Sequence, residues 1–220
     1  MIYRGDYTRN NNGYEDFFCD SHKYDNILED VKEHLKSKDI IYSYLNISDL
    51  NCELLNNFNR YQNVTYVVRN MEGIKQIVLN PYVDDWDYTI KNEIIFRNFK
   101  ECLLDGGVVI IATYNNYVIG FASLLGKPIG SKKEYYELAQ LHVSYEFRRF
   151  NIGSNLFNMC VSQVKEWGGR RLYIQAHQAF ETQEFYKAMG CVNAKENILH
   201  HVIFEPYDCQ LEFNIEHPVI

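Results

Sequence analysis

Residues 141–157 read LHVSYEFRRFNIGSNLF, and this stretch decides the fold. Its first three residues end an apolar strand predicted over 135–143. Its last six residues begin a helix predicted over 152–167, in which Leu156, Cys160 and Val164 share one face. A short basic loop with one glycine joins the two. Because the first N–H groups of a helix have no internal partner and lie at the positive end of its dipole, this arrangement favours an anion-binding loop.

Strands and helices are predicted on both sides of this stretch. Apolar runs at 107–113 and 117–126, joined at Asn115-Asn116, predict an antiparallel pair. A further strand is expected at 171–177, and a helix at 180–189 with Gly190 as its cap. Earlier in the chain we expect a hairpin of 64–70 with 74–80, a connector over 81–88 and a helix over 90–104. This order predicts an α+β protein with one central sheet.

The two ends of the chain have weaker patterns. We expect a surface helix at 24–37, a strand at 41–47, and a helix capped by Ser48 whose stripe includes Leu50, Leu54 and Phe58. In the tail, 198–215, two strand-like runs (LHHVIF and CQLEFNI) are split by Pro206. We therefore divide the chain into a helical N-terminal extension, 1–38, that packs on a main domain, 39–220.

Composition limits the kinds of partner. The net charge is 22 − 29 = −7, so the chain is a poor general binder of nucleic acid and suits a cationic partner better. The longest apolar run, VVIIA at 108–112, is too short to cross a bilayer, and the first residues lack the apolar core of a signal peptide. The six cysteines form no CxxC pair and indicate buried free thiols. A cytoplasmic protein is expected.

The residues of the loop leave two interpretations open: a phosphate-binding loop and a solvated basic turn. Gly153 would let the backbone approach a ligand, and Ser154 adds a hydroxyl. The Lys-Ser/Thr pair of a P-loop is missing, which argues against the rival prediction of a nucleotide-binding enzyme.

The run 141–157 resembles the coenzyme A-binding segment of the GCN5-related N-acetyltransferases (GNAT), in which an apolar strand precedes Arg/Gln-x-x-Gly-x-Gly/Ala at a helix start. Arg148 matches the first position and Gly153 the last. Asn151 replaces the middle glycine, and Asn tolerates positive φ better than most residues. The likeness extends in element order over about 107–191. It implies a mixed, mostly antiparallel central sheet with helices on both faces.

The resemblance also implies acetyl-CoA as co-substrate, with no metal. Backbone amides of the loop would hold the pyrophosphate; the loop residues are Arg148, Arg149, Phe150, Asn151, Ile152, Gly153 and Ser154. Leu141, His142 and Val143 would pair with the pantetheine arm, and a backbone N–H there would polarise the thioester carbonyl. In such proteins a bulge commonly splays this strand from its neighbour.

Acyl transfer to an amine needs a proton donor and a proton acceptor. FYKAMG (185–190) resembles the family's tyrosine-bearing helix, which makes Tyr186 the candidate acid, although Ala179 and Cys191 depart from the family pattern. Three alternatives stay open for the base: Glu137, His142 or a water chain. Glu137 and His142 have opposite parity, so a regular strand would show only one of them to the slot.

Carboxylates beside aromatic rings would attract a cationic amine, which predicts an acceptor site made of Tyr82, Asp84, Asp85 and Trp86. His200-His201 is rejected as a metal site, because neighbours on a strand point to opposite faces. We predict an N-acetyltransferase acting on a small cationic amine, a streptothricin-type antibiotic included, or on an exposed peptide amine. Neither nucleic acid nor membrane is an expected partner, and a homodimer is left open. A non-catalytic acyl-CoA sensor of the same fold is the alternative.

Overall fold

The computed structural model describes residues 39–71 and 74–215. A seven-stranded sheet with the order β1-β4-β5-β6-β7-β9-β8 forms its centre. The strands are β1 (Ile41–Tyr44), β4 (Val108–Tyr114), β5 (Tyr117–Leu124), β6 (Tyr135–Val143), β7 (Arg171–Ala176), β8 (Val192–Asn193) and β9 (Cys209–Asn214). Only β6 and β7 pair in parallel, and the other neighbours are antiparallel. The predicted mixed, mostly antiparallel sheet is therefore confirmed.

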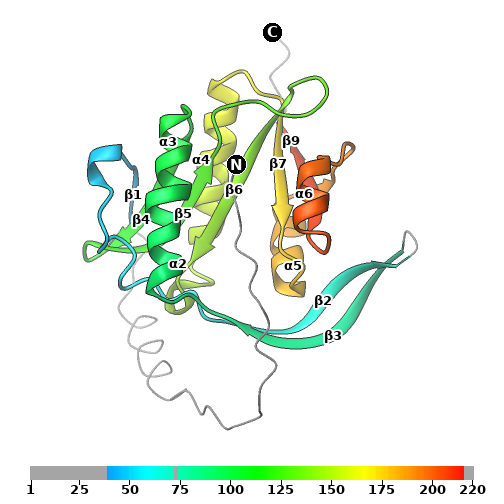
Figure 1. Ribbon diagram of the computed structural model, residues 1–220, viewed down its shortest axis with the longest axis horizontal. Helices are drawn as coiled ribbons and strands as arrows, with labels where there is room; N and C mark the ends of the chain where they lie inside the picture. Colours follow the sequence, from blue (N-terminus) through cyan, green and yellow to red (C-terminus); the bar gives the residue numbers. More distant parts are fainter. Residues whose placement is uncertain (1–38, 72–73, 216–220) are drawn as a thin grey trace.

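Helices cover both faces of the sheet (Figure 1). On one face, α4 (Ile152–Glu166) and α5 (Phe180–Ala188) bury Leu156, Phe157 and Tyr186 against the strands. On the other face, α2 (Tyr88–Glu93), η3 (Ile94–Phe99) and α3 (Lys100–Leu104) follow one another without a break. Their apolar side chains pack on Val109, Ile111 and Phe121. We call these the α4 face and the α2 face.

A long hairpin crosses the molecule outside the central sheet (Figure 1). It consists of β2 (Gln62–Met71) and β3 (Ile74–Asp84), so the predicted hairpin is confirmed with longer strands. The N–H of Val68 donates to the Gln178 carbonyl at 2.8 Å, and Val67 forms a bridge with Ala179. These contacts fasten the hairpin to the loop between β7 and α5, where it can form one side of a cleft.

Two predicted elements are wrong, and one lies outside the described residues. The helix expected from Ser48 is a short 3-10 turn, η2 (Ile47–Asp49), followed by turns. The carboxylate of Asp49 accepts the Asn46 N–H, and the Asn51 side chain accepts the Glu53 N–H, so local side-chain bonds compete with a helix. LHHVIF is a helix, α6 (Leu199–Phe204), rather than a strand. The helix predicted at 24–37 is not among the described residues.

The cysteines agree largely with the expectation of buried thiols. Cys102, Cys160 and Cys191 are buried free thiols, Cys209 is partly buried, and Cys52 is exposed. Burial raises the pKa of each of the three buried thiols to about 12, so they stay protonated and unreactive near neutral pH.

No helix in the described part of the chain is both long and apolar enough to span a bilayer.

Candidate active site

A gap opens in the sheet between β6 and β7. The two strands pair only from Tyr135 with Arg171 to Leu138 with Ile174. A register shift at Ser123/Leu124 of β5 gives β6 an extra residue between Leu138 and Gln140, which is a bulge. Figure 1 shows β6 and β7 diverging beyond that point, toward the end where the hairpin crosses. The bulge thus creates a slot between two otherwise adjacent strands.

The backbone of β6 directs polar groups into this slot. The Ser144 N–H donates to the Ile119 carbonyl of β5 at 2.8 Å, and His142 pairs with Phe121 in the same register. Because successive residues of a strand turn their N–H groups to opposite edges, Leu141 and Val143 turn theirs toward β7. The slot edge of β6 therefore offers the N–H groups that an extended ligand could pair with.

The loop at the end of the slot has an unusual backbone. Arg149 and Asn151 both adopt left-handed conformations, with φ of 72° and 60°. Asn151 is the cap of α4 and accepts the Asn155 N–H at 2.9 Å. For Arg149 this conformation costs about 1–2 kcal/mol, and such strain concentrates at functional sites. The loop leads directly into the first turn of α4, whose unpaired N–H groups suit an anion.

Gly153 lies in the first turn of α4, where helices α4 and α5 meet. A Cβ at this position would lie 3.3 Å from the ring of Phe185 and 3.6 Å from Val143. The contact is tighter than ordinary van der Waals packing, so a larger side chain would displace Phe185 or fill the space above the helix terminus. The lack of a side chain at Gly153 thus permits the close packing of α4 on Phe185, and no left-handed backbone is involved.

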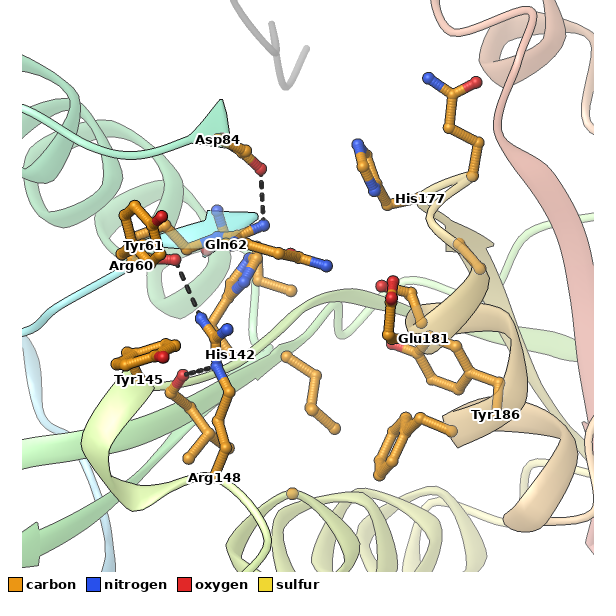
Figure 2. Close-up of a pocket in the computed structure, with 18 of the residues that line it drawn as sticks. Arg60, Tyr61, Gln62, Asp84, His142, Tyr145, Arg148, His177, Glu181 and Tyr186 are labelled. Carbon is orange, nitrogen blue, oxygen red and sulfur yellow. Dashed lines mark hydrogen bonds and ion pairs between the residues drawn. The ribbon is translucent and has the colours of Figure 1, made fainter. Parts of the chain in front are cut away.

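Tyr186 lies on α5, across the slot from β6. Its ring packs with Phe185 and Phe157 at centroid distances of 5.1 and 6.3 Å. In Figure 2 the side chain runs from α5 toward the cavity. Its exposed fraction is 6%, so a proton on the phenol would be held in a nearly dry environment.

A cavity of about 1390 Å³ joins the slot, the loop and the hairpin. Figure 2 shows Arg60, His142 and Arg148 on one wall and His177, Glu181 and Tyr186 on the opposite wall. Trp86 belongs to the first wall, because its ring contacts His142 and the guanidinium of Arg60. The α4 terminus, with Asn151, Gly153 and Ser154, closes one end. The cavity therefore brings together the loop, the slot and all four predicted acceptor residues, Tyr82, Asp84, Asp85 and Trp86.

Trp86 lies at the centre of the first wall, which we call the acceptor wall. Its ring meets His142 edge-on at 4.7 Å and stacks on Phe58 at 5.8 Å. The guanidinium of Arg60 lies 5.4 Å from the Trp86 ring centroid, a cation–π contact. These contacts fix the orientation of both Trp86 and the imidazole of His142.

The predicted carboxylates of the acceptor wall already have donors. Asp84 forms a 2.7 Å ion pair with Arg60, whose side chain is almost fully buried. Asp85 accepts the Trp86 N–H at 2.7 Å. Tyr82 bonds His177 at 3.0 Å, and burial raises the pKa of its phenol. Asp84 is therefore neutralised inside the wall and offers less attraction to a cationic amine than the sequence pattern indicates.

Arg148 points away from the helix terminus. Its Nε donates to the Val143 carbonyl at 3.1 Å, and one Nη donates to the Arg60 carbonyl at 2.9 Å. Figure 2 shows the side chain rising from its loop toward Arg60, with α4 below it. Burial and the neighbouring charge of Arg60 lower the pKa of the Arg148 guanidinium to about 10. The side chain thus belongs to the acceptor wall, although its backbone begins the loop.

Glu137 is not brought together with the other candidates. It is buried, and its carboxylate bonds Nε2 of His201 on α6 at 3.1 Å, outside the cavity. The sequence pattern predicted that a regular strand would turn Glu137 and His142 to opposite faces. Because the bulge adds one residue between them, both face the α2 side of the sheet: Glu137 is paired with Tyr173 of β7, and His142 contacts Phe121 of β5. His142 lines the cavity and Glu137 does not.

Sequence reasoning missed Arg60, His177 and Glu181 of the cavity walls. Arg60 follows a segment predicted as helix, and no local pattern links it to Asp84, 24 residues later. Glu181 lies in the first turn of α5, and no local pattern distinguishes it from an ordinary acidic residue at a helix start. The contact of His177 with Tyr82 depends on the hairpin crossing the slot.

Within the described residues, no group of three or more His, Cys, Asp or Glu side chains could hold a metal ion. His200 and His201 lie on helix α6 rather than on the expected strand.

Solved acetyltransferases share this fold. Nourseothricin acetyltransferase matches with a TM-score of 0.60 at 11% identity, over 81% of this chain and 99% of that chain. A putative streptothricin acetyltransferase from Bacillus anthracis str. Ames, in complex with acetyl coenzyme A, matches with a TM-score of 0.57 at 14% identity, over 79% and 95%. A GNAT-family acetyltransferase from Staphylococcus aureus Mu50 has a TM-score of 0.51 at 17% identity, over 80% and 99%.

The sequence defines the family more closely than the fold does. Residues 71–191, more than half of the chain, match the model of the acetyltransferase (GNAT) family. The chain belongs to this family, and the resemblance inferred from residues 141–157 is confirmed. A comparison with curated proteins found no match.

Proposed function

We propose that this protein transfers an acetyl group from acetyl-CoA to a primary amine of a small acceptor, by direct attack of the amine on the thioester. The observation that carries the proposal is the slot between β6 and β7, which ends at the left-handed loop and the α4 terminus. An acyltransferase activity follows from the family. Acetyl as the acyl group and an amine as the acceptor are the parts that need a test.

Three features support acetyl-CoA as the co-substrate. The slot edge of β6 presents the N–H groups of Leu141 and Val143 to an extended arm. The loop, with Arg149 and Asn151 left-handed, leads into the N-terminus of α4, which suits a pyrophosphate. The cavity, at about 1390 Å³, exceeds the roughly 300–1,000 Å³ of a pocket for one small ligand, which leaves room for two substrates.

The reaction assigns a role to each side of the slot. A β6 N–H would stabilise the negative charge that develops on the thioester oxygen. Tyr186, on the α5 side, would donate its proton to the departing thiolate, because a phenol is a donor at neutral pH. His142, which Trp86 orients within the acceptor wall, would accept the ammonium proton directly or through water. Glu137 takes no part in this scheme, since it lies outside the cavity.

The test is a thiol-release screen with acetyl-CoA over a panel of amines: polyamines, aminoglycosides, streptothricin, amino acids and peptide N-termini. We expect thiol release with at least one class of amine, and mass spectrometry of the product should show one added acetyl group on nitrogen.

Binding of acetyl-CoA is measured separately by thermal stabilisation, since a ligand that binds only the folded state raises its melting temperature. Stabilisation without release of thiol from any amine would overturn the proposal in favour of a non-catalytic acyl-CoA sensor. Stabilisation by ATP or GTP at least as large as that by acetyl-CoA would favour a nucleotide-binding enzyme instead.

A further inference from the structure

We propose that the acceptor carries a carboxylate close to its amine, as an amino acid does, and that Arg148 binds this carboxylate from the acceptor wall. The inference rests on the proposed function, because it names the substrate class of the same site. It departs from the purely cationic acceptor that the acidic sequence pattern indicates, because the acceptor would also carry a negative charge.

The geometry of Arg148 supports this role. Two of its nitrogens, Nε and one Nη, are fixed by the carbonyls of Val143 and Arg60. The guanidinium also lies 5.5 Å from the centroid of the Tyr145 ring. The remaining nitrogen, Nη1, has no hydrogen-bond partner within residues 39–71 and 74–215. A guanidinium held by neutral carbonyls, with one nitrogen still available and facing a cavity, is prepared to bind an anion.

The charges around Arg148 point the same way. Arg60 is matched by its ion pair with Asp84. Glu146 also attracts Arg148, but its carboxylate accepts bonds from Asn59 at 2.5 Å and Ser144 at 3.0 Å and lies outside the cavity. Burial and the charge of Arg60 together outweigh these carboxylates, since the pKa of Arg148 is lowered to about 10. A ligand carboxylate beside Arg148 would offset the unfavourable energy of its buried charge, whereas a cationic ligand group would increase that energy.

Two carboxylates on this side of the cavity are paired with cations: Asp84 with Arg60, and Glu93 with Arg97. Asp85 accepts the backbone N–H of Trp86. On the opposite wall, Glu181 reaches from the first turn of α5 into the cavity (Figure 2). A cation on one side and an anion on the other suit a zwitterion, with its carboxylate toward Arg148 and its ammonium toward the slot.

The first experiment uses the wild-type protein and matched acceptors. Phenylalanine is compared with phenylalaninamide and phenethylamine, and lysine with lysinamide and cadaverine, in the thiol-release assay. We expect kcat/KM to be about 10- to 100-fold higher for the amino acid than for its amide, which corresponds to about 1.4–2.8 kcal/mol for a charge-assisted bond. Amines without a carboxylate that react equally well or better would overturn the inference and leave the proposed function intact.

The second experiment replaces the guanidinium. In Arg148→Met the preference for acid over amide should fall to within about threefold, whatever the change in the absolute rates. If Arg148 only braces the backbone, both acceptors would lose rate equally and their ratio would persist. Arg148→Lys keeps the charge and should keep part of the preference, which covers the case in which the Met variant does not fold. Arg170→Met, at an exposed position remote from the cavity, is the matched control.

A third arm needs no turnover. With coenzyme A present, N-acetylphenylalanine should raise the melting temperature of the protein more than N-acetylphenylalaninamide does, and Arg148→Met should remove the difference. Equal stabilisation by both compounds would contradict the carboxylate site. If no amine releases thiol in any assay, the proposed function fails, and this comparison still decides whether the cavity prefers a carboxylate.

Discussion

In the proposed function, the two ends of the cavity would recognise their ligands by different means. At the loop, backbone N–H groups would bind the pyrophosphate, and the side chains matter through the conformations they permit: Arg149 and Asn151 are left-handed, and Gly153 has no side chain to fill the space above α4. At the acceptor wall, the side chains of Arg60, Trp86, His142 and Arg148 would contact the acceptor. We therefore expect substitutions at the loop to act by changing the space and the backbone conformation available to the ligand. Substitutions at the wall should act by removing the side-chain groups that contact the acceptor.

The largest effect should come from the residue between the two ends. Tyr186→Phe removes only the phenol oxygen, so kcat should fall about 100-fold because the thiolate loses its proton donor. The affinity for acetyl-CoA should stay within about threefold. Tyr136→Phe is a matched control, because Tyr136 packs on Trp167 away from the cavity. An unchanged kcat in Tyr186→Phe would show that another group, or water, is the acid.

The next largest effect should come from filling the free space at Gly153, in the first turn of α4. Gly153→Val should weaken acetyl-CoA binding about 5- to 150-fold, which corresponds to the roughly 1–3 kcal/mol that overpacking a tight site costs. Gly153→Ala adds a single methyl group at 3.3 Å from Phe185 and should cost clearly less. Isothermal titration with acetyl-CoA measures both. Equal affinity in the Val variant and the wild type would mean that the ligand does not approach this turn.

These two ends also differ in how far the sequence could predict them. The strand 135–143, the loop and the helix from 152 follow from local periodicity and a single glycine, and the structure has all three. The left-handed Asn151 was foreseeable because Asn tolerates that region. Local patterns carry such information whenever one segment supplies the whole feature.

The acceptor wall could not be predicted in this way, because its residues come from separate segments. Arg60 meets Asp84 only after the hairpin folds back on itself, and Trp86 meets His142 only through the contact of hairpin and sheet. The bulge between Leu138 and Gln140 has no signature in the pattern, yet it places Glu137 and His142 on one face. Long-range pairing, rather than local propensity, decided these positions.

A smaller effect is expected from the ring at the centre of the acceptor wall. Trp86→Phe replaces the indole, which contacts His142 and Arg60, with a smaller phenyl ring. We expect KM for the acceptor to rise about two- to tenfold, the scale of one aromatic contact, with the affinity for acetyl-CoA unchanged. Steady-state kinetics with each substrate varied in turn separates the two. A change confined to acetyl-CoA would mean that Trp86 belongs to the cofactor end.

The smallest effect is the one that most sharply tests the comparison. Arg149→Ala should weaken acetyl-CoA binding by less than about fivefold, because an exposed charge in water contributes only about 0.2–1 kcal/mol. The left-handed backbone at this position is equally strained for Ala and Arg, so the variant changes charge and leaves the conformational cost in place. Raising the salt concentration should change the affinity of wild type and variant in parallel. If Arg149→Ala proves more harmful than Gly153→Val, the loop binds by charge, and the contrast between a backbone end and a side-chain end of the cavity is wrong.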